Sequence, residues 1–314
     1  MTLVAIALIA ILAVFSTFLS CSNEKGDKGD KGDGSSSANE NPQGLQFYPQ
    51  DDGTYVVSCG DAKDLSNIVI PATYKGGAVV GVDNSAFNSC TNLKSIVIPD
   101  SVTSIGSSAF YGCTGLTDIV IPDSVETIGE YAFAFCSNLS EITLGESLRA
   151  IGGWAFYNCT GLTSIVVPDS VISIGLGAFY GCTGLTSIVI PDSVTSIGNY
   201  AFWGCTGLTS IVIPDSVETI GEYAFANCSN LSEITLGESL RAIGADAFEG
   251  CTGLTSIVIP DSVTSIGDSA FWGCTGLTDV YYTGTEAEWA EISIDSGNSY
   301  LTKATIHYNY VPEN

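Results

Sequence analysis

CTGLTSIVIPDSVTSIGNYAFWG, at residues 182–204, is one of eight consecutive copies of a 23-residue motif in this 314-residue chain. Nine cysteines, from Cys90 to Cys274, keep the spacing without a break. A fixed period of this length is typical of a solenoid, because each unit buries its apolar face only when a neighbour stacks on it. The eight complete units occupy residues 90–273.

The order of apolar residues inside one unit predicts two short strands. Ile188 and Ile190 alternate around Val189, which is the pattern of a strand with one buried face. Pro191 cannot donate to a strand ladder and ends this strand, and a second extended piece follows at 196–197. We interpret the rest of each unit as a helical turn. The predicted fold is a right-handed repeat solenoid of parallel strands, with short helical turns on its convex side.

Irregular sequences flank the repeats, as expected for the two caps of a solenoid. Residues 45–89 form the predicted N-terminal cap and a first irregular repeat, in which Asp51-Asp52-Gly53 indicates a hairpin turn. Residues 274–314 form the predicted C-terminal cap. There Thr285 and Glu288 have the spacing of a capping box, which predicts a short helix.

The repeat LxxIxIPxSVxxIGxxAFxxC resembles the BspA-like leucine-rich repeats, as do IPATYKGGAVVGVDNSAF at 70–87 and VYYTGTEAEWAEI at 280–292. The resemblance extends from about Leu45 to the C-terminus. It implies a leucine-rich-repeat β-solenoid and a bacterial cell-surface protein that adheres to host matrix proteins or to other cells. It implies no catalytic residues, and the family motif fixes no ligand-contacting residue.

Residues 1–20 form an apolar run that stops at Cys21. This run resembles a lipoprotein signal peptide, which is cleaved before a cysteine that is then acylated, so Cys21 is the predicted lipid-attachment site. The alternative is an uncleaved membrane anchor, because about 20 apolar residues can span a bilayer. Both interpretations predict an exported protein, anchored at the bacterial cell surface on the outer membrane or on the outer face of the cytoplasmic membrane.

The segment 21–44 has the composition of a flexible linker, with collagen-like Lys-Gly-Asp triplets that are too few for a triple helix. The formal net charge of the chain, −25, argues against a nucleic-acid partner because phosphates would be repelled. A single histidine, His307, leaves no histidine-based metal site and no obvious general base. We therefore predict no enzyme activity, no metal and no cofactor.

Stacking turns each outward position of the repeat into a column along the rod. The central position of the first strand carries β-branched residues in every unit, and this apolar strip is the first candidate binding face. Its members are Val97, Val120, Thr143, Val166, Val189, Val212, Thr235 and Val258.

Variable positions around the Ala-Phe pair of each repeat are unusually aromatic. Some of these rings must cover the turns, and the remainder would be exposed, where Tyr and Trp are favoured as binding anchors. The pattern does not choose between this second candidate face and the apolar strip. The candidate aromatic face consists of Tyr131, Trp154, Tyr200, Trp203, Tyr223 and Trp272.

Two further columns are cysteine and acidic. The cysteines are expected to be free core thiols, because parallel side-chain vectors disfavour disulfides between neighbouring units. The acidic column is expected to support the turns, and its alternative is a ladder of divalent-cation sites. Its members are Asp100, Asp123, Glu146, Asp169, Asp192, Asp215, Glu238 and Asp261.

A longer repeat lies above the 23-residue one, since residues 113–152 recur almost unchanged at 205–244. This duplication predicts two near-equivalent outer surfaces, marked by Tyr131 and Tyr223. The predicted function is adhesion, with the solenoid surface recognising an extracellular-matrix or cell-surface protein or a glycan. The alternative is a structural surface or stalk protein that has no specific ligand.

Overall fold

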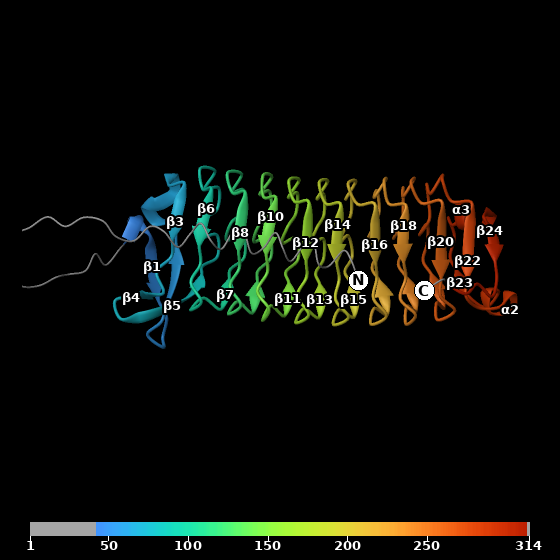
Figure 1. Cartoon of the computed structure of the whole chain (residues 1–314), viewed down its shortest axis with the longest axis horizontal. Coiled ribbons are helices and arrows are strands. Elements are labelled where there is room, and N and C mark those ends of the chain that lie inside the picture. The colour runs from blue at the N-terminus through green and yellow to red at the C-terminus, as the bar shows by residue number, and fades with distance from the viewer. Residues whose placement is uncertain (1–41, 313–314) are drawn as a thin grey trace, which may run out of the picture. The chain divides into compact units, whose positions relative to one another are not determined.

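The computed structural model describes residues 42–312, which lie in one compact unit, Asn39–Asn314. The predicted signal segment, its lipid-attachment site Cys21 and the linker up to residue 41 lie outside the described residues. From residue 45 onward the chain is a parallel β-solenoid, as predicted. Figure 1 shows its rungs following one another along the long axis, from β3 to β24.

Each repeat contributes a longer strand at the predicted SIV position. Apolar side chains of this strand alternate between core and solvent. The members of this set, with their equivalents in the caps, are β3 (Asn67–Val69), β6 (Ser95–Val97), β8 (Asp118–Val120), β10 (Glu141–Thr143), β12 (Ser164–Val166), β14 (Ser187–Val189), β16 (Ser210–Val212), β18 (Glu233–Thr235), β20 (Ser256–Ile259), β22 (Asp279–Tyr282) and β24 (Thr305–His307).

A second strand of two residues follows the turn after the first strand in every repeat, also as predicted. These strands join into one continuous sheet with the cap strands, and they pair in register from unit to unit, for example Ile197 with Ile220. They are β7 (Ser104–Ile105), β9 (Thr127–Ile128), β11 (Ala150–Ile151), β13 (Ser173–Ile174), β15 (Ser196–Ile197), β17 (Thr219–Ile220), β19 (Ala242–Ile243), β21 (Ser265–Ile266) and β23 (Ser293–Ile294).

The two sides of the solenoid differ in how their ladders continue. The two-residue strands form an unbroken path from β7 to β23. The longer strands pair in separate sets, such as β8 with β10 and β12 with β14, with no ladder between β10 and β12. The surface formed by the longer strands is therefore a series of short parallel ladders.

The third side of each unit consists of hydrogen-bonded turns, such as Trp203 N to Tyr200 O at 3.1 Å, which do not continue into a regular helix. In the unit that contains Tyr200, backbone N–H groups bond forward to the next rung, from Tyr200 to Glu222 O (2.8 Å) and from Phe202 to Ala224 O (2.7 Å). Tyr200 and Gly204 also take positive φ angles of 58° and 67°, which interrupt a helix. The turns consequently form a third column of hydrogen-bonded rungs.

Two ladders of side chains fill the centre. Nine phenylalanines, from Phe87 to Phe271, are fully buried, and neighbouring ring centroids lie 5.1–5.5 Å apart. The cysteine column runs beside them, and each thiol from Cys113 onward donates to the carbonyl of a phenylalanine 26 residues earlier, as Cys205 does to Phe179 O at 3.1 Å. The thiols from Cys90 to Cys274 are free and buried.

The N-terminal cap contains the predicted hairpin, formed by β1 (Gln46–Pro49) and β2 (Tyr55–Ser58). The side chain of Gln43 covers the free edge of β3, because its Oε1 accepts from Val69 N at 2.8 Å. The remaining elements of this cap are η1 (Pro42–Gly44), η2 (Gly60–Asp64), β4 (Thr73–Tyr74) and β5 (Gly77–Val82).

The C-terminal cap contains two short helices, α2 (Glu286–Trp289) and α3 (Ser299–Lys303). The predicted capping box is confirmed: Thr285 Oγ1 accepts from Glu288 N, and the Glu288 carboxylate accepts from Thr285 N at 2.8 Å. Both caps thus satisfy backbone groups that the regular repeats would leave unpaired at the ends of the rod.

Candidate functional site

The predicted apolar strip is solvent-exposed along most of its length. Its valines at 97, 120, 166, 189 and 212 are 50–61% exposed, and the threonines at 143 and 235 are exposed as well. Their neighbours in sequence, such as Ile188, point into the core. Val258 differs because it is half-buried, in a rung where β22 places Tyr281 beside it.

The C-terminal end of the strip is aromatic, which the repeat pattern did not predict. His307 stacks on Tyr281 at 4.6 Å, and Tyr310 meets the same ring at 4.7 Å. The parallel register β20–β22–β24 aligns Val258, Tyr281 and His307 in one column. This ending lies in the irregular cap, where the 23-residue period no longer indicates which residues face outward.

The turn side of the solenoid carries a continuous cluster of nine rings, which we call the aromatic surface. Its first row stacks Tyr131 on Trp154 and Tyr200 on Tyr223, with interplanar angles of 7° and 6°. Its second row, which contains Tyr157, Tyr180 and Trp203, runs alongside and is linked to the first through Trp154. The nine residues are Tyr111, Tyr131, Phe135, Trp154, Tyr157, Tyr180, Tyr200, Trp203 and Tyr223.

Gly177 explains how the first row stays continuous across a rung that has no ring. A Cβ at this glycine would lie 2.3 Å from Cε3 of Trp154, so the indole occupies the space that a side chain would need. Trp154 consequently reaches Tyr180 at 5.3 Å and Tyr200 at 6.4 Å. A single tryptophan therefore joins the two halves of the first row.

Five of the six residues of the predicted aromatic face come together in this cluster, and Trp272 does not. Trp272 is 53% exposed and has its own neighbour, Tyr300, at 6.5 Å. Phe135 was missed, because it stands where most units have Gly, Ser or Asn. Phe135 packs between Tyr111 and Tyr157, in a rung where the second-row position is occupied by the small residue Ala134.

The two copies of the duplicated block make the same turn contacts, as Asp123 with Glu146 and Asp215 with Glu238, but their aromatic residues differ in surroundings. Tyr131 begins the first row and stacks on Trp154, whereas Tyr223 ends that row, stacked on Tyr200. Beyond Tyr223 the next rung carries Asp246. The rings around Tyr131 and Tyr223 therefore have different surroundings, because identical segments meet different neighbouring units.

The first-row aromatic residues occupy a backbone conformation that disfavours them. Tyr131, Trp154, Tyr200 and Tyr223 have φ angles of 55–58°. A left-handed conformation costs an L-residue about 1–2 kcal/mol, and glycine is free of this cost. The equivalent residue Gly177 shows that the fold accepts glycine at this position. Aromatic side chains are thus present where backbone stability alone would favour glycine.

Carboxylates close the C-terminal end of the aromatic surface. A hydrogen bond to the Asp246 carboxylate, together with the repulsion that this carboxylate exerts on a phenolate, raises the pKa of Tyr223 to about 12. Burial, together with the nearby Asp246, raises the pKa of Glu249 above its ordinary value. Two acidic groups therefore lie close together at this end of the rings.

The acidic column gives no support for a cation site. Asp123 Oδ1 accepts from Glu146 N at 3.1 Å, and Asp215 Oδ1 accepts from Glu238 N at 2.9 Å. These bonds join successive rungs and support the turns. Within residues 42–312 no group of three or more His, Cys, Asp or Glu residues is arranged to hold a metal ion.

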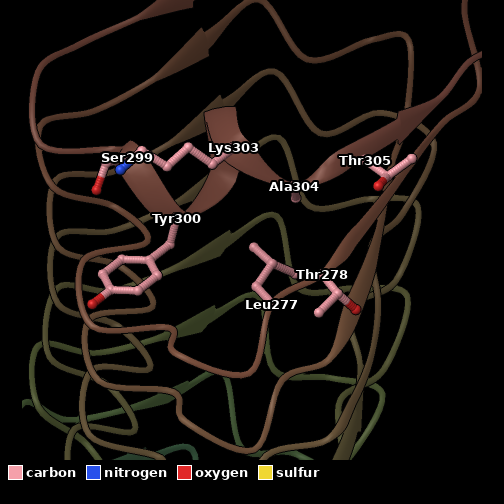
Figure 2. Close-up of a pocket in the computed structure, with 7 residues that line it drawn as sticks. All are labelled: Leu277, Thr278, Ser299, Tyr300, Lys303, Ala304 and Thr305. Carbon is pink, nitrogen blue, oxygen red and sulfur yellow. The ribbon is translucent and has the colours of Figure 1, made fainter.

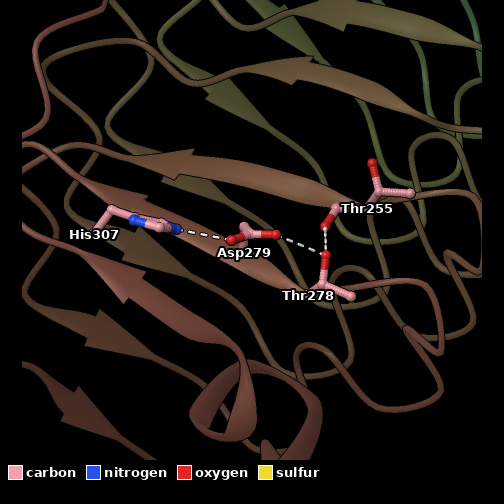
Figure 3. Close-up of polar contacts among 4 residues, drawn as sticks. All are labelled: Thr255, Thr278, Asp279 and His307. Atoms are coloured by element: carbon pink, nitrogen blue, oxygen red, sulfur yellow. Dashed lines mark hydrogen bonds and ion pairs between the residues drawn. The ribbon is translucent and has the colours of Figure 1, made fainter.

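His307 takes part in a hydrogen-bonded chain that connects three rungs (Figure 3). Its Nε2 lies 2.7 Å from Asp279 Oδ1, and Thr278 donates to Asp279 Oδ2 at 2.8 Å. These bonds hold the pKa of Asp279 below its ordinary value. A nucleophilic triad needs the imidazole between hydroxyl and carboxylate, whereas here the carboxylate lies in the middle. This series of hydrogen bonds joins β22 to β24, and its order of hydroxyl, carboxylate and imidazole is not the order that activates a nucleophile.

A hollow of about 440 Å³ lies beside α3 in the C-terminal cap. Figure 2 shows the side chains of Leu277 and Tyr300 along this hollow, with Lys303 on the helix above it. Lys303 supplies the only charged side chain of the lining, so no acid–base pair converges there. The remaining lining residues are Thr278, Ser299, Ala304 and Thr305.

The buried thiols are poorly suited to nucleophilic chemistry. Burial raises the pKa of Cys182 and of Cys228 to about 12, so both remain protonated near neutral pH. The thiolate is the reactive form of cysteine, and a buried, protonated thiol is inert. The cysteine column is therefore a structural part of the core.

A two-sheet solenoid of 23-residue units, with its outward side chains in columns, defines a leucine-rich-repeat scaffold. The family model described as BspA type leucine rich repeat region (6 copies) matches residues 59–185 and 154–278. The chain therefore belongs to the BspA-type leucine-rich-repeat family. No curated protein sequence matches the chain.

Two solved structures of bacterial leucine-rich repeat proteins are similar to this chain. A leucine-rich repeat protein from T. pallidum is 28% identical, with a TM-score of 0.52, and the match covers 75% of this chain and 89% of that one. A leucine rich cell surface protein from Faecalibacterium prausnitzii A2-165 is 29% identical over 81% of this chain and 97% of that chain, with a TM-score of 0.37.

Between residues 42 and 312, no helix has the length and apolar character that crossing a membrane requires.

Proposed function

We propose that the protein is a bacterial cell-surface adhesion protein, without catalytic activity, that binds a protein or glycan partner through outward side chains of its solenoid. The observation that carries this proposal is the exposure of apolar side chains on a rod whose core is complete without them. Val166 and Val212 are each 61% exposed, while the phenylalanine and cysteine ladders fill the interior. Exposed apolar strips of this kind mark contact surfaces.

The polar surroundings of the strip favour a reversible interaction with a partner. Serines and acidic residues flank the valines, as Ser187 and Asp118 do in their strands. A polar border around an apolar centre is the usual composition of a protein–protein interface. A structural stalk would have no need of the paired apolar strip and aromatic surface.

The test is capture of the full chain on immobilised matrix proteins and on a panel of glycans. A variant with Val189→Ser and Val212→Ser should lose a large part of any binding that uses the strip, because two exposed apolar contacts are removed without disturbing the core. The matched control is Ile172→Ser, which removes an equally exposed apolar side chain outside the strip. Absence of capture on every matrix protein and glycan would refute adhesion and favour the structural alternative.

We further propose that Cys21 carries the lipid that anchors the protein at the cell surface. The support is the apolar run that ends at this cysteine. Metabolic labelling with a fatty acid should mark the wild-type chain and leave Cys21→Ala unlabelled. Labelling that persists in Cys21→Ala would contradict the assignment of the lipid to this residue.

A further inference from the structure

Many rings of the aromatic surface stack face to face with a neighbouring ring. Tyr200 and Tyr223 stack at 4.9 Å with an interplanar angle of 6°, and Tyr180 stacks on Trp203 at 4.3 Å and 12°. In the interior of the rows, where Tyr200 lies between Trp154 and Tyr223, neighbouring rings cover both faces, and the edges and hydroxyl groups are what remains for solvent. Ring edges carry partial positive charge, and ring faces carry the negative charge. The surface therefore complements carbonyl oxygens better than it complements cations or flat rings placed face to face.

This geometry separates two classes of ligand. A sugar ring or an ammonium group that packs on an aromatic residue needs a free ring face. An extended proline-rich segment needs aromatic edges and grooves between rings, together with donors for its unpaired backbone carbonyls. The tyrosine hydroxyls and the indole N–H groups of Trp154 and Trp203 are donors of that kind.

Charge narrows the class of partner further. Asp246 and Glu249 lie at the end of the rings, and exposed Glu130 and Glu222 directly precede Tyr131 and Tyr223. Among residues 42–312, neither Asp246 nor Glu249 forms an ion pair. A second copy of this chain, with its formal charge of −25, would be repelled by these carboxylates. A segment that carries Arg or Lys would be attracted to them.

We propose that the aromatic surface binds an extended, proline-rich polypeptide segment whose Arg or Lys side chains reach Asp246 and Glu249. This inference rests on the proposed adhesion function and names the chemistry of one partner. From Tyr131 to Tyr223 the surface spans four rungs, or about 19 Å at the spacing of β-strands. About six residues in the polyproline conformation cover that length.

The left-handed backbone of the first row supplies a clean way to test the proposal. Glycine is favoured over tyrosine at φ angles near 58°, so Tyr200→Gly and Tyr223→Gly remove rings without adding backbone strain. Asp246→Asn is equally compatible, because asparagine tolerates a positive φ. The matched controls are Trp272→Ala, an exposed tryptophan outside the aromatic surface, and Asp192→Asn, an exposed carboxylate of the acidic column.

The experiment measures binding of a fluorescent synthetic peptide, in which proline alternates with alanine and two arginines stand at one end, to the full chain. The double variant Tyr200→Gly with Tyr223→Gly should weaken binding about 30-fold, which is the loss expected for hot-spot residues. Asp246→Asn with Glu249→Gln should weaken it about 10-fold and reduce its dependence on salt. Both controls should bind as the wild-type chain does, and circular dichroism should show that every variant is folded.

Several results would overturn the proposal. They are absence of peptide binding at millimolar concentration, equal binding of a peptide with glutamates in place of the arginines, and equal loss in Trp272→Ala. Binding of a linear glucan oligosaccharide that displaces the peptide would assign the rings to glycans instead. If the peptide fails while the full chain is still captured by a matrix protein, this inference is wrong and the adhesion function stands.

Discussion

Phe202→Ala is the substitution that measures most directly how the rod is held together. The ring of Phe202 is fully buried, with the centroid of Phe179 at 5.4 Å and that of Phe225 at 5.2 Å. Truncating a buried phenylalanine costs about 3–5 kcal/mol, and each lost ring pair is worth about 0.5–1.5 kcal/mol of that amount. Backbone bonds hold the neighbouring turns at a fixed spacing, so the cavity cannot collapse. We expect a loss of about 4 kcal/mol in the free energy of unfolding.

The assay is urea unfolding followed by tryptophan fluorescence, supported by hydrogen exchange of the rungs around residue 202. The matched control is Phe135→Ala, which removes the same ring from a half-buried position on the aromatic surface. This control should cost about 1–2 kcal/mol. A loss below about 1.5 kcal/mol for Phe202→Ala, or a loss equal to that of the control, would refute the idea that the phenylalanine ladder supports the solenoid.

Three further predictions concern the thiols, a glycine and a cap. The free energy of unfolding should fall between pH 9 and about 12, because the unfolded thiol of Cys228 ionises near 9.0 while the folded one stays protonated to about 12; Cys228→Ala should flatten this slope by about 1.4 kcal/mol per pH unit. Gly177→Ala should lower the free energy of unfolding by about 2 kcal/mol, measured by thermal unfolding, because the new Cβ meets Trp154 at a positive φ. Thr285→Ala should cost about 1 kcal/mol in the same measurement, since it removes the cap shared with Glu288.

Each of these predictions has a clear contrary result. The pH slope would be unaltered in Cys228→Ala if the thiol ionised equally in the folded and unfolded states. Gly177→Ala with wild-type stability would mean that the Trp154 indole is free to move away. For Thr285→Ala, unchanged stability would show that the cap helix adds nothing to the end of the rod.

The strands and the core could be predicted from the sequence because every unit repeats the same pattern of apolar and polar residues. Ile188 and Ile190 must both face the core while Val189 faces solvent, which only one strand orientation satisfies, and proline ends the strand in most units. The turn conformation was harder to predict. Its forward hydrogen bonds depend on the next rung, and a tyrosine such as Tyr200 gives no local sign that it adopts a left-handed conformation. Gly177, at the equivalent position of the preceding unit, was the available sign.

The aromatic surface could be predicted in part. The candidate residues were visible because they vary while the Ala-Phe pair does not. Their grouping depends on Trp154 leaning over a rung without a side chain and on Phe135 lying out of column, and neither follows from the period. Tyr281 and His307 belong to the cap, where the 23-residue period no longer assigns residues to faces.

The most direct test of the central claim is hydrogen–deuterium exchange of the full chain, alone and bound to a matrix protein that captures it. We predict new protection in the turns that carry Tyr131, Trp154, Tyr200 and Tyr223, or in the strands of the valine strip, while amides beside the phenylalanine ladder are unchanged. Protection confined to the two caps, or no protection on binding, would contradict the claim that the outward columns of the solenoid recognise a partner.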